Sequence, residues 1–381
     1  MKKIEFIKSA APSITNKEIN LVHKAVSFGW GKNMNLYIDK FSKKFSKFVG
    51  QKYFLPTSHC TDAIHLALLS IGIKKNDEVI VPDLTWVASA APIVHVGAIP
   101  IFADIDLKNY CISLSSIKQK ITKKTKAIIV VDLLGSMPEW KEIKKFCRKK
   151  KIIIIEDAAE GLGAYYDNKP AGSFGDISVF SFNATKLIMA GQGGALCTNN
   201  SKFYEKAVSL SQHGINKSKT GKYYWSNEIG FNYRWSNIQA ALGLAQFDRI
   251  KSLLRYKTKI HNLYYKHINQ IEEISFLKNN KKIKNSFWIN PITFSSKVKH
   301  SKEYICDYFL KNKIDMRPMF YTLSSMPPFK KFLSHSKNKI TNKNSKLISD
   351  RSILLPNGYD LNEASIIRIK KVLLKLLSHK S

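Results

Sequence analysis

Three short segments in the middle of the chain carry side chains whose types and spacing could do chemistry. An apolar run over 152–155 leads into the carboxylate of Asp157, a β-rich run is followed by Lys186, and a glycine-rich turn occupies 191–194. A lysine amine can act as a nucleophile or carry a proton, and a buried carboxylate can hold a cationic group. Each residue also has a simpler interpretation, because the aspartate could cap a following helix and the lysine could be solvated.

These residues follow predicted strands of an α/β fold. Strands are expected over 52–56, 78–81, 100–103, 127–132, 152–156, 177–181 and 194–198, with helices over 61–71, 88–96 and 139–149. Uniformly apolar strands separated by helices are typical of a parallel sheet that is buried on both faces. Ligands bind such sheets at the carboxyl ends of the strands, which is where Asp157 and Lys186 fall.

The rest of the chain indicates a second, smaller α/β unit. A long helical region is expected over 237–270, a strand over 287–294, a helix over 302–311 and a polar loop over 337–346. We therefore expect a large domain over 1–245, which includes the N-terminal segment, and a small C-terminal domain over 246–381.

The charge of the chain is unusual. Its 62 lysines and arginines against 28 acidic residues give a net charge of +34. Nucleic-acid binding is one interpretation of this positive charge. However, the lysines are spread along the whole chain, which is also rich in isoleucine and asparagine. We therefore expect no dedicated nucleic-acid function, and instead a positive field that attracts an anionic small-molecule substrate.

Other compositional features exclude several classes of protein. The five cysteines are scattered without a CxxC pair, which suits reduced thiols better than disulfides or a zinc site. No HxH or HExxH motif suggests a metal, so no metal ligand is predicted, and His65, His95 and His213 are left without a role. No apolar run approaches the roughly 20 residues of a membrane-spanning helix, and the N-terminus does not resemble a signal peptide. We expect a cytoplasmic protein.

Four further segments make the pattern specific. They lie at 27–30 (SFGW), 57–65 (TSHCTDAIH), 82–88 (PDLTWVA) and 230–241 (GFNYRWSNIQAA). With these segments the sequence resembles, nearly end to end, the sugar aminotransferases of the DegT/DnrJ/EryC1/StrS family. The resemblance implies a fold type I (aspartate aminotransferase-like) transferase dependent on pyridoxal 5′-phosphate, with pyridoxamine 5′-phosphate as the intermediate form of the cofactor.

The resemblance gives the central residues their roles. Lys186 would form the covalent link to the cofactor aldehyde and, once displaced, carry a proton between substrate and cofactor. Asp157 would pair with the pyridine nitrogen and keep it protonated, so that the ring acts as an electron sink. Lys186 must be able to supply a neutral amine, which burial beside the cofactor can provide.

The resemblance also implies how the rest of the cofactor is bound. Cys60 and Thr61 open a helix whose N-terminal amides suit a phosphate dianion, and Ser181 would add a hydroxyl. In the family, an asparagine from the neighbouring subunit reaches this phosphate, and Asn232 occupies that position, which implies a homodimer with shared active sites. Trp86 would stack on the cofactor ring, or it is an ordinary core aromatic residue.

The substrate side of the site departs from the family in places. Glu160 stands where histidine or glutamine is commoner, so it is either protonated or directed to the substrate or the lysine. Glutamate occurs there in a subgroup that includes the perosamine synthases, which the segment 314–329 also resembles. Arg317 and Tyr321 are thus candidates for binding the nucleotide-sugar, or they are surface and packing residues of the small domain. Thr322 and Ser324 replace the proline and histidine usual in those relatives.

The function implied by the resemblance is transfer of an amino group from L-glutamate to a nucleotide-linked ketosugar. The first choice of acceptor is the C4 keto group of GDP-4-keto-6-deoxymannose, for surface polysaccharide such as O-antigen. A UDP- or dTDP-linked 3- or 4-ketosugar is an alternative acceptor. Related sugar dehydratases carry histidine in place of Lys186, which disfavours that reaction. A regulatory or nucleic-acid-binding protein on the same fold is the alternative from another class.

Overall fold

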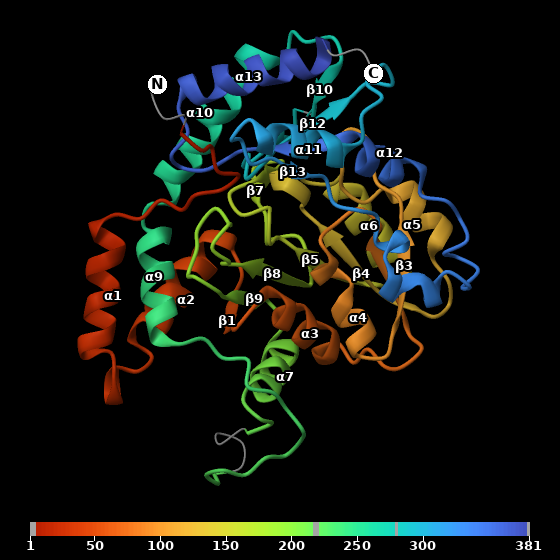
Figure 1. Cartoon of the computed structure of the whole chain (residues 1–381). Coiled ribbons are helices and arrows are strands. Elements are labelled where there is room, and N and C mark those ends of the chain that lie inside the picture. Colours follow the sequence, from red (N-terminus) through yellow and green to blue (C-terminus); the bar gives the residue numbers. More distant parts are fainter. Residues whose placement is uncertain (1–4, 216–220, 279–280, 379–381) are drawn as a thin grey trace.

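A seven-stranded sheet forms the centre of the molecule (Figure 1). The computed structural model describes residues 5–215, 221–278 and 281–378. The strand order is β1 (Tyr53–Thr57), β9 (Gly194–Thr198), β8 (Ile177–Ser181), β5 (Ile153–Asp157), β4 (Thr125–Val131), β2 (Glu78–Pro82) and β3 (Ile99–Ala103). Strands β8, β5, β4, β2 and β3 pair in parallel, whereas β9 runs antiparallel to both of its neighbours. The predicted α/β class with a mostly parallel sheet is confirmed, and each of the seven strands predicted over 52–198 is present within two residues of its expected bounds.

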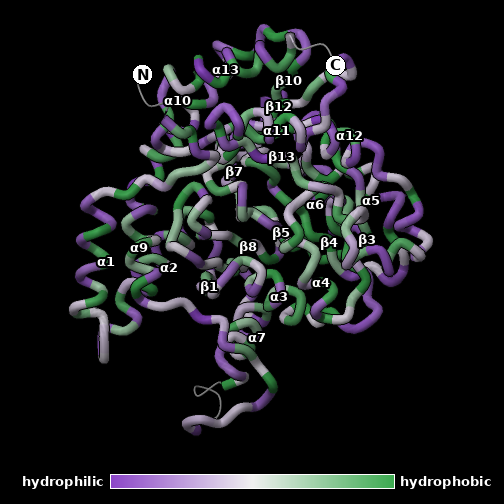
Figure 2. The backbone as a smooth tube through the Cα atoms, in the orientation of Figure 1, coloured by the Kyte–Doolittle hydropathy of each residue, from purple (hydrophilic) through white to green (hydrophobic). Residues whose placement is uncertain are grey.

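The sheet is covered by helices on both faces because its strands are apolar on both sides. In β4, Ile128 and Val130 belong to one hydrophobic core, while Ile129 and Val131 belong to the other. The first core includes residues of α2 (Leu36–Val49), α5 (Leu114–Lys120), α6 (Trp140–Lys150) and α9 (Asn237–Phe247). The second includes residues of α3 (Cys60–Ser70), α4 (Ala91–His95) and α7 (Ser201–Ser211). Figure 2 shows the hydrophobic character of β4, α3 and α9.

A second sheet with its own core lies at the top of Figure 1. It is antiparallel, in the order β10 (Ile274–Phe276), β12 (Asn290–Phe294), β14 (Ser352–Leu355) and β13 (Arg317–Pro318). Its core includes residues of α10 (Ile250–Ile268), α11 (Lys302–Lys311) and α13 (Glu363–Ser378). The N-terminal segment also reaches this part, because Ile7 lies in the same core and forms a parallel bridge with Ile314.

The long helical region predicted over 237–270 consists of two helices. Helix α9 ends at Phe247 and packs against α1 (Asn16–Phe28) and α2, whereas α10 begins at Ile250 and packs against α13. The chain turns between them because the two helices contact different layers. The predicted domain boundary between residues 245 and 246 lies just before this turn, and we retain it as a proposal.

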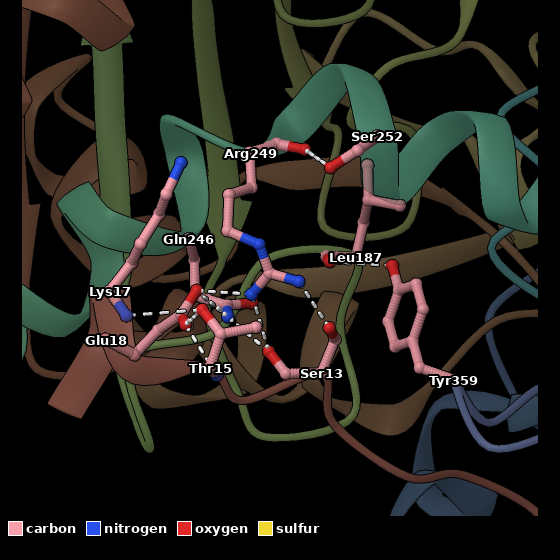
Figure 3. A network of polar contacts seen from close by, with 9 residues as sticks. All are labelled: Ser13, Thr15, Lys17, Glu18, Leu187, Gln246, Arg249, Ser252 and Tyr359. Carbon is pink, nitrogen blue, oxygen red and sulfur yellow. Dashed lines mark hydrogen bonds and ion pairs between the residues drawn. The ribbon is translucent and has the colours of Figure 1, made fainter.

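The turn between α9 and α10 is fixed by a buried polar network (Figure 3). Arg249 donates to Glu18 Oε1 at 2.6 Å and to the carbonyl oxygen of Ser13 at 3.1 Å. Gln246 Nε2 donates to the same carboxylate oxygen of Glu18 at 2.8 Å. Glu18 is only 1% exposed, so its charge depends on these partners.

The polar tract predicted as a loop over 337–346 is a loop only as far as Asn342, because α12 (Lys343–Arg351) begins at the next residue. The loop is anchored to α5 and to strand β3 of the large sheet. The buried amine of Lys120 donates to the carbonyl oxygens of Lys337 and Ile340, each at 2.8 Å, and Asn338 donates to the carbonyl oxygen of Pro100 at 3.0 Å.

Candidate active site

A cavity of about 340 Å³ lies where strands β5 and β8 end, a volume ordinary for a small-molecule site. It is lined by seven of the predicted residues, Cys60, Thr61, Trp86, Asp157, Glu160, Ser181 and Lys186. Further lining residues come from distant segments, among them Thr85, Ser89, Trp288 and Phe320. The fold therefore assembles one site from the strand ends, the start of α3 and the C-terminal part of the chain.

The amine of Lys186 lies between a carboxylate and an aromatic ring. Its Nζ is 3.3 Å from Glu160 Oε1 and 3.9 Å from the centroid of the Trp288 ring. The side chain of Lys186 is 14% exposed, so the solvated alternative does not describe it. A lysine held in this way is directed into the cavity with its amine fixed.

Asp157 presents a buried carboxylate to the same cavity. Ser89 Oγ donates to Oδ2 at 2.7 Å, and the Ala159 amide donates to Oδ1 at 3.1 Å. Burial raises the pKa of Asp157, against the effect of these hydrogen bonds and of the Lys186 charge. Residues 159–163, which follow it closely, form turns and not a helix, so the helix-capping alternative does not apply. A carboxylate in this setting suits a cationic ring nitrogen.

Glu160 is directed to the lysine, which is one of the two possibilities that the sequence left open. Its second oxygen, Oε2, accepts the amide N–H of Leu134 at 2.9 Å. Burial raises the pKa of Glu160, while the neighbouring Lys186 charge lowers it. The ion pair thus offsets part of the cost of burying this carboxylate.

The start of α3 is suited to an anionic group. The preceding residue, His59, makes no side-chain cap, and Cys60 and Thr61 at the first turn line the cavity. Free N-terminal amides carry partial positive charge and bind phosphate groups. Strand β9 approaches this turn closely at Gly194, where a Cβ atom would lie 2.4 Å from the backbone nitrogen of Cys60. Ser181 pairs with Gly194 in the sheet, so the hydroxyl and the helix start face the same space.

Three predicted residues do not line the cavity in this chain. Asn232 is exposed and forms a backbone bridge with Gln212. The exposed Arg317 guanidinium binds Asp315 Oδ2 at 3.0 Å. Tyr321 donates to Glu303 Oε1 at 2.6 Å, and this bond raises the pKa of Tyr321 to about 12.

Several cavity residues were not predicted from the sequence, among them Thr85, Ser89, Trp288 and Phe320. Thr85 and Ser89 had a local signal, because Thr85 lies inside the segment 82–88 and Ser89 directly follows it. Phe320 lies inside the segment 314–329, whereas Trp288 had no local signal, since it reaches the site only through the tertiary fold.

Among the described residues, no group of three or more His, Cys, Asp or Glu side chains is arranged to bind a metal ion. Nor does any helix in the described part of the chain have the length and apolarity needed to cross a membrane. The residues present do fit pyridoxal phosphate. The cavity offers an amine for the aldehyde, a buried carboxylate for the ring nitrogen and a helix N-terminus for the phosphate.

Comparison with known proteins also identifies an aminotransferase that depends on pyridoxal phosphate. The model of the DegT/DnrJ/EryC1/StrS aminotransferase family matches residues 12–374. The GDP-perosamine synthase of Escherichia coli O157:H7 is 34% identical over 366 residues, which cover 96% of this chain and 97% of that protein. The GDP-perosamine synthase of Vibrio cholerae is 32% identical over 346 residues, which cover 91% of this chain and 92% of the relative.

A solved structure agrees with this comparison. Helicobacter pylori PseC, an aminotransferase involved in the biosynthesis of pseudoaminic acid, superposes with a TM-score of 0.90 at 26% identity. The match covers 99% of this chain and 100% of that one. The fold is thus that of the type I pyridoxal-phosphate-dependent transferases. The chain belongs to the DegT/DnrJ/EryC1/StrS family, and it is a pyridoxal-phosphate-dependent sugar aminotransferase.

Proposed function

We propose that the chain transfers the amino group of L-glutamate to C4 of GDP-4-keto-6-deoxymannose and so produces GDP-perosamine. The observation that carries this proposal is the similarity to three proteins named GDP-perosamine synthase, which are 34%, 32% and 32% identical over 96%, 91% and 86% of this chain. Aminotransferases that act on UDP- or dTDP-linked 3- or 4-ketosugars are the alternative within the family.

Lys186 and Asp157 carry the chemistry in this proposal. Bound pyridoxal phosphate supplies an aldehyde that takes up the amino group and a ring that withdraws electrons. Lys186 Nζ binds the aldehyde carbon between reactions and, when free, moves a proton to or from the substrate carbon. The buried carboxylate of Asp157 holds the proton of the ring nitrogen, and the Ser89 hydroxyl, at 2.7 Å, orients that carboxylate.

The remaining groups bind and orient. The α3 amides at Cys60 and Thr61, with the Ser181 hydroxyl, hold the phosphate, and Trp86 covers the ring. Asn232 of one subunit reaches the phosphate of the other, so the protein works as a homodimer with shared active sites. The exposure of Asn232 and its absence from the lining of its own cavity support this arrangement.

The substrate is an anionic nucleotide-sugar in this proposal. Arg317 provides a charge-assisted bond to the diphosphate, and Tyr321 contacts the sugar or the nucleotide. Support comes from the exposed Arg317 guanidinium, 63% accessible, and from the net charge of +34, which favours encounter with an anion. The reaction takes place in the cytoplasm and supplies amino sugar for surface polysaccharide such as O-antigen.

The test is product analysis with three acceptors. Purified protein is incubated with pyridoxal phosphate, L-glutamate and the GDP-, UDP- or dTDP-linked 4-keto-6-deoxy sugar, with Lys186→Ala as the control. We expect a GDP-linked 4-amino sugar, identified by mass and by NMR of the C4 proton, and no product from the control. Amination of the UDP or dTDP sugar alone would replace the proposed substrate. Salt-dependent DNA binding without any turnover would favour the regulatory alternative.

A further inference from the structure

The peptide that carries Lys186 is held on both sides by the C-terminal part of the chain. Trp288 donates its indole N–H to the carbonyl oxygen of Thr185 at 2.8 Å. Tyr359 donates its hydroxyl to the carbonyl oxygen of Leu187 at 3.1 Å (Figure 3). The two residues that flank the lysine in sequence therefore each accept a hydrogen bond from a buried or half-buried aromatic side chain.

Trp288 also contacts the amine itself. The ring centroid lies 3.9 Å from Lys186 Nζ, and the tryptophan is only 6% exposed. A cation over an indole face is attracted by the ring quadrupole, most strongly when water is excluded. On the other side, Glu160 Oε1 lies 3.3 Å from the same nitrogen. The ammonium thus has one charged and one aromatic partner.

The position of Trp288 is itself fixed by buried contacts. Asn357, 2% exposed, donates to the carbonyl oxygens of Phe287 and Trp288. Ser286 donates its amide to the carbonyl oxygen of Gly135 at 3.0 Å. A Cβ at Gly135 would lie 3.0 Å from the backbone nitrogen of Trp288, so the two segments pack with no room for a side chain there.

The turn formed by Leu134 and Gly135 contacts both partners of Lys186. Leu134 precedes Gly135, and its amide donates to Glu160 Oε2 at 2.9 Å. Leu134 has φ 55° and Gly135 has φ 83°, so the turn adopts left-handed backbone at two successive residues. The turn that follows β4 therefore contacts the carboxylate on one side of the lysine and the tryptophan segment on the other.

We propose that Trp288 is a positioning residue for Lys186. It holds the free ammonium beside the cavity whenever the lysine is not bonded to the cofactor, so that the amine returns to the same place in each cycle. The inference rests on the proposed role of Lys186 as the residue that binds the cofactor aldehyde. A purely packing role would need only an apolar side chain of similar size, and would not need a ring face directed at Nζ or an indole N–H bonded to Thr185.

The test is the chemical reactivity of Lys186 in the cofactor-free protein. The rate of acylation of Lys186 by an amine-reactive ester is measured by peptide mass spectrometry and normalised to exposed Lys297. We expect Trp288→Leu to raise the normalised rate by about 2- to 30-fold, which corresponds to the range of cation–π energies. Trp288→Phe keeps a weaker aromatic face, so its rate should lie between those of wild type and Trp288→Leu. Tyr359→Phe is the matched control, because it removes the other hydrogen bond but not the ring over the amine, and its rate should stay near wild type.

Three outcomes would overturn the proposal. They are an unchanged rate in Trp288→Leu, equal rates in Trp288→Leu and Trp288→Phe, and an equal rise in Tyr359→Phe. If Trp288→Leu does not fold, Trp288→Phe alone decides: a higher acylation rate of Lys186 than in wild type supports the proposal, and an unchanged rate overturns it. In the loaded enzyme, the proposal predicts a lower kcat with little change in the KM for L-glutamate. Failure of the underlying role of Lys186 is seen separately, because borohydride would then fail to fix the cofactor to the Lys186 peptide.

Discussion

Replacement of Gly194 by alanine should weaken cofactor binding without unfolding the protein. Gly194 begins β9 and pairs with Thr57 on one side and Ser181 on the other. A Cβ atom there would lie 2.4 Å from both the Cys60 nitrogen and the His59 carbonyl carbon. These are backbone atoms at the start of α3, so they cannot move aside as the end of a side chain can.

The size of the effect follows from this distance. Ordinary contact begins near 3.4 Å, so strand and helix must separate by about 1 Å. A hydrogen bond of about 2.9 Å from the helix start to a phosphate oxygen would be lengthened to about 3.9 Å and lost. A bond to a charged acceptor contributes about 1.5–3 kcal/mol, which predicts that the Kd for pyridoxal phosphate rises about 10- to 150-fold.

The assay is equilibrium titration of the cofactor-free protein with pyridoxal phosphate, with thermal unfolding measured on the same samples. Gly243→Ala is the control, since Gly243 lies inside α9 and its nearest neighbour is the end of the Trp235 ring at 3.2 Å. The control should bind the cofactor as tightly as wild type. An unchanged Kd in a folded Gly194→Ala protein would refute the assignment of the phosphate to the start of α3.

Three further substitutions test the buried polar groups. Burial raises the pKa of Asp157, so the folded, cofactor-free protein favours the protonated form of this group. The resulting stability is fully present below the unfolded pKa of about 4 and is lost as pH rises and the carboxylate ionises. Asp157→Asn should therefore unfold at higher urea than wild type at pH 8, by roughly 1 kcal/mol or more, with the difference vanishing towards pH 4 while turnover is lost. Asp83→Ala removes the acceptor of three hydrogen bonds, each of 2.8 Å, from Ser324 and Asn342 in the segment after Phe320. It should lower the free energy of unfolding by about 2–4 kcal/mol and raise the KM of the ketosugar more than that of glutamate. Arg249→Ala leaves the carboxylate of Glu18 buried without its cation and should lower the free energy of unfolding, measured in urea, by about 3–5 kcal/mol. An equal loss in Lys297→Ala, which breaks an exposed ion pair, would contradict the role of burial.

The sequence predicted the parts of the fold that depend on local pattern. The strands were found because each is a short apolar run between turns, and Asp157 and Lys186 stood out because they follow predicted strands. The roles of these two residues, and the choice of Ser181, Cys60 and Thr61, came from the resemblance to the family. All of these residues line the cavity.

Features that depend on tertiary contacts were not predictable in this way. Strand β9 runs antiparallel within an otherwise parallel set, yet it is as apolar as its neighbours, so its direction leaves no local trace. The turn between α9 and α10 separates two helices whose partners lie in different layers. Trp288 and Phe320 reach the cavity only through the packing of the C-terminal part on the sheet.

The most direct test of the aminotransferase assignment is an absorbance titration of the protein loaded with pyridoxal phosphate. We predict a band of lysine-bound cofactor that disappears on adding L-glutamate and returns on adding GDP-4-keto-6-deoxymannose. Lys186→Ala should lack the band and retain no cofactor after borohydride reduction. Absence of any cofactor band in the wild-type protein, even with excess pyridoxal phosphate, would contradict the account.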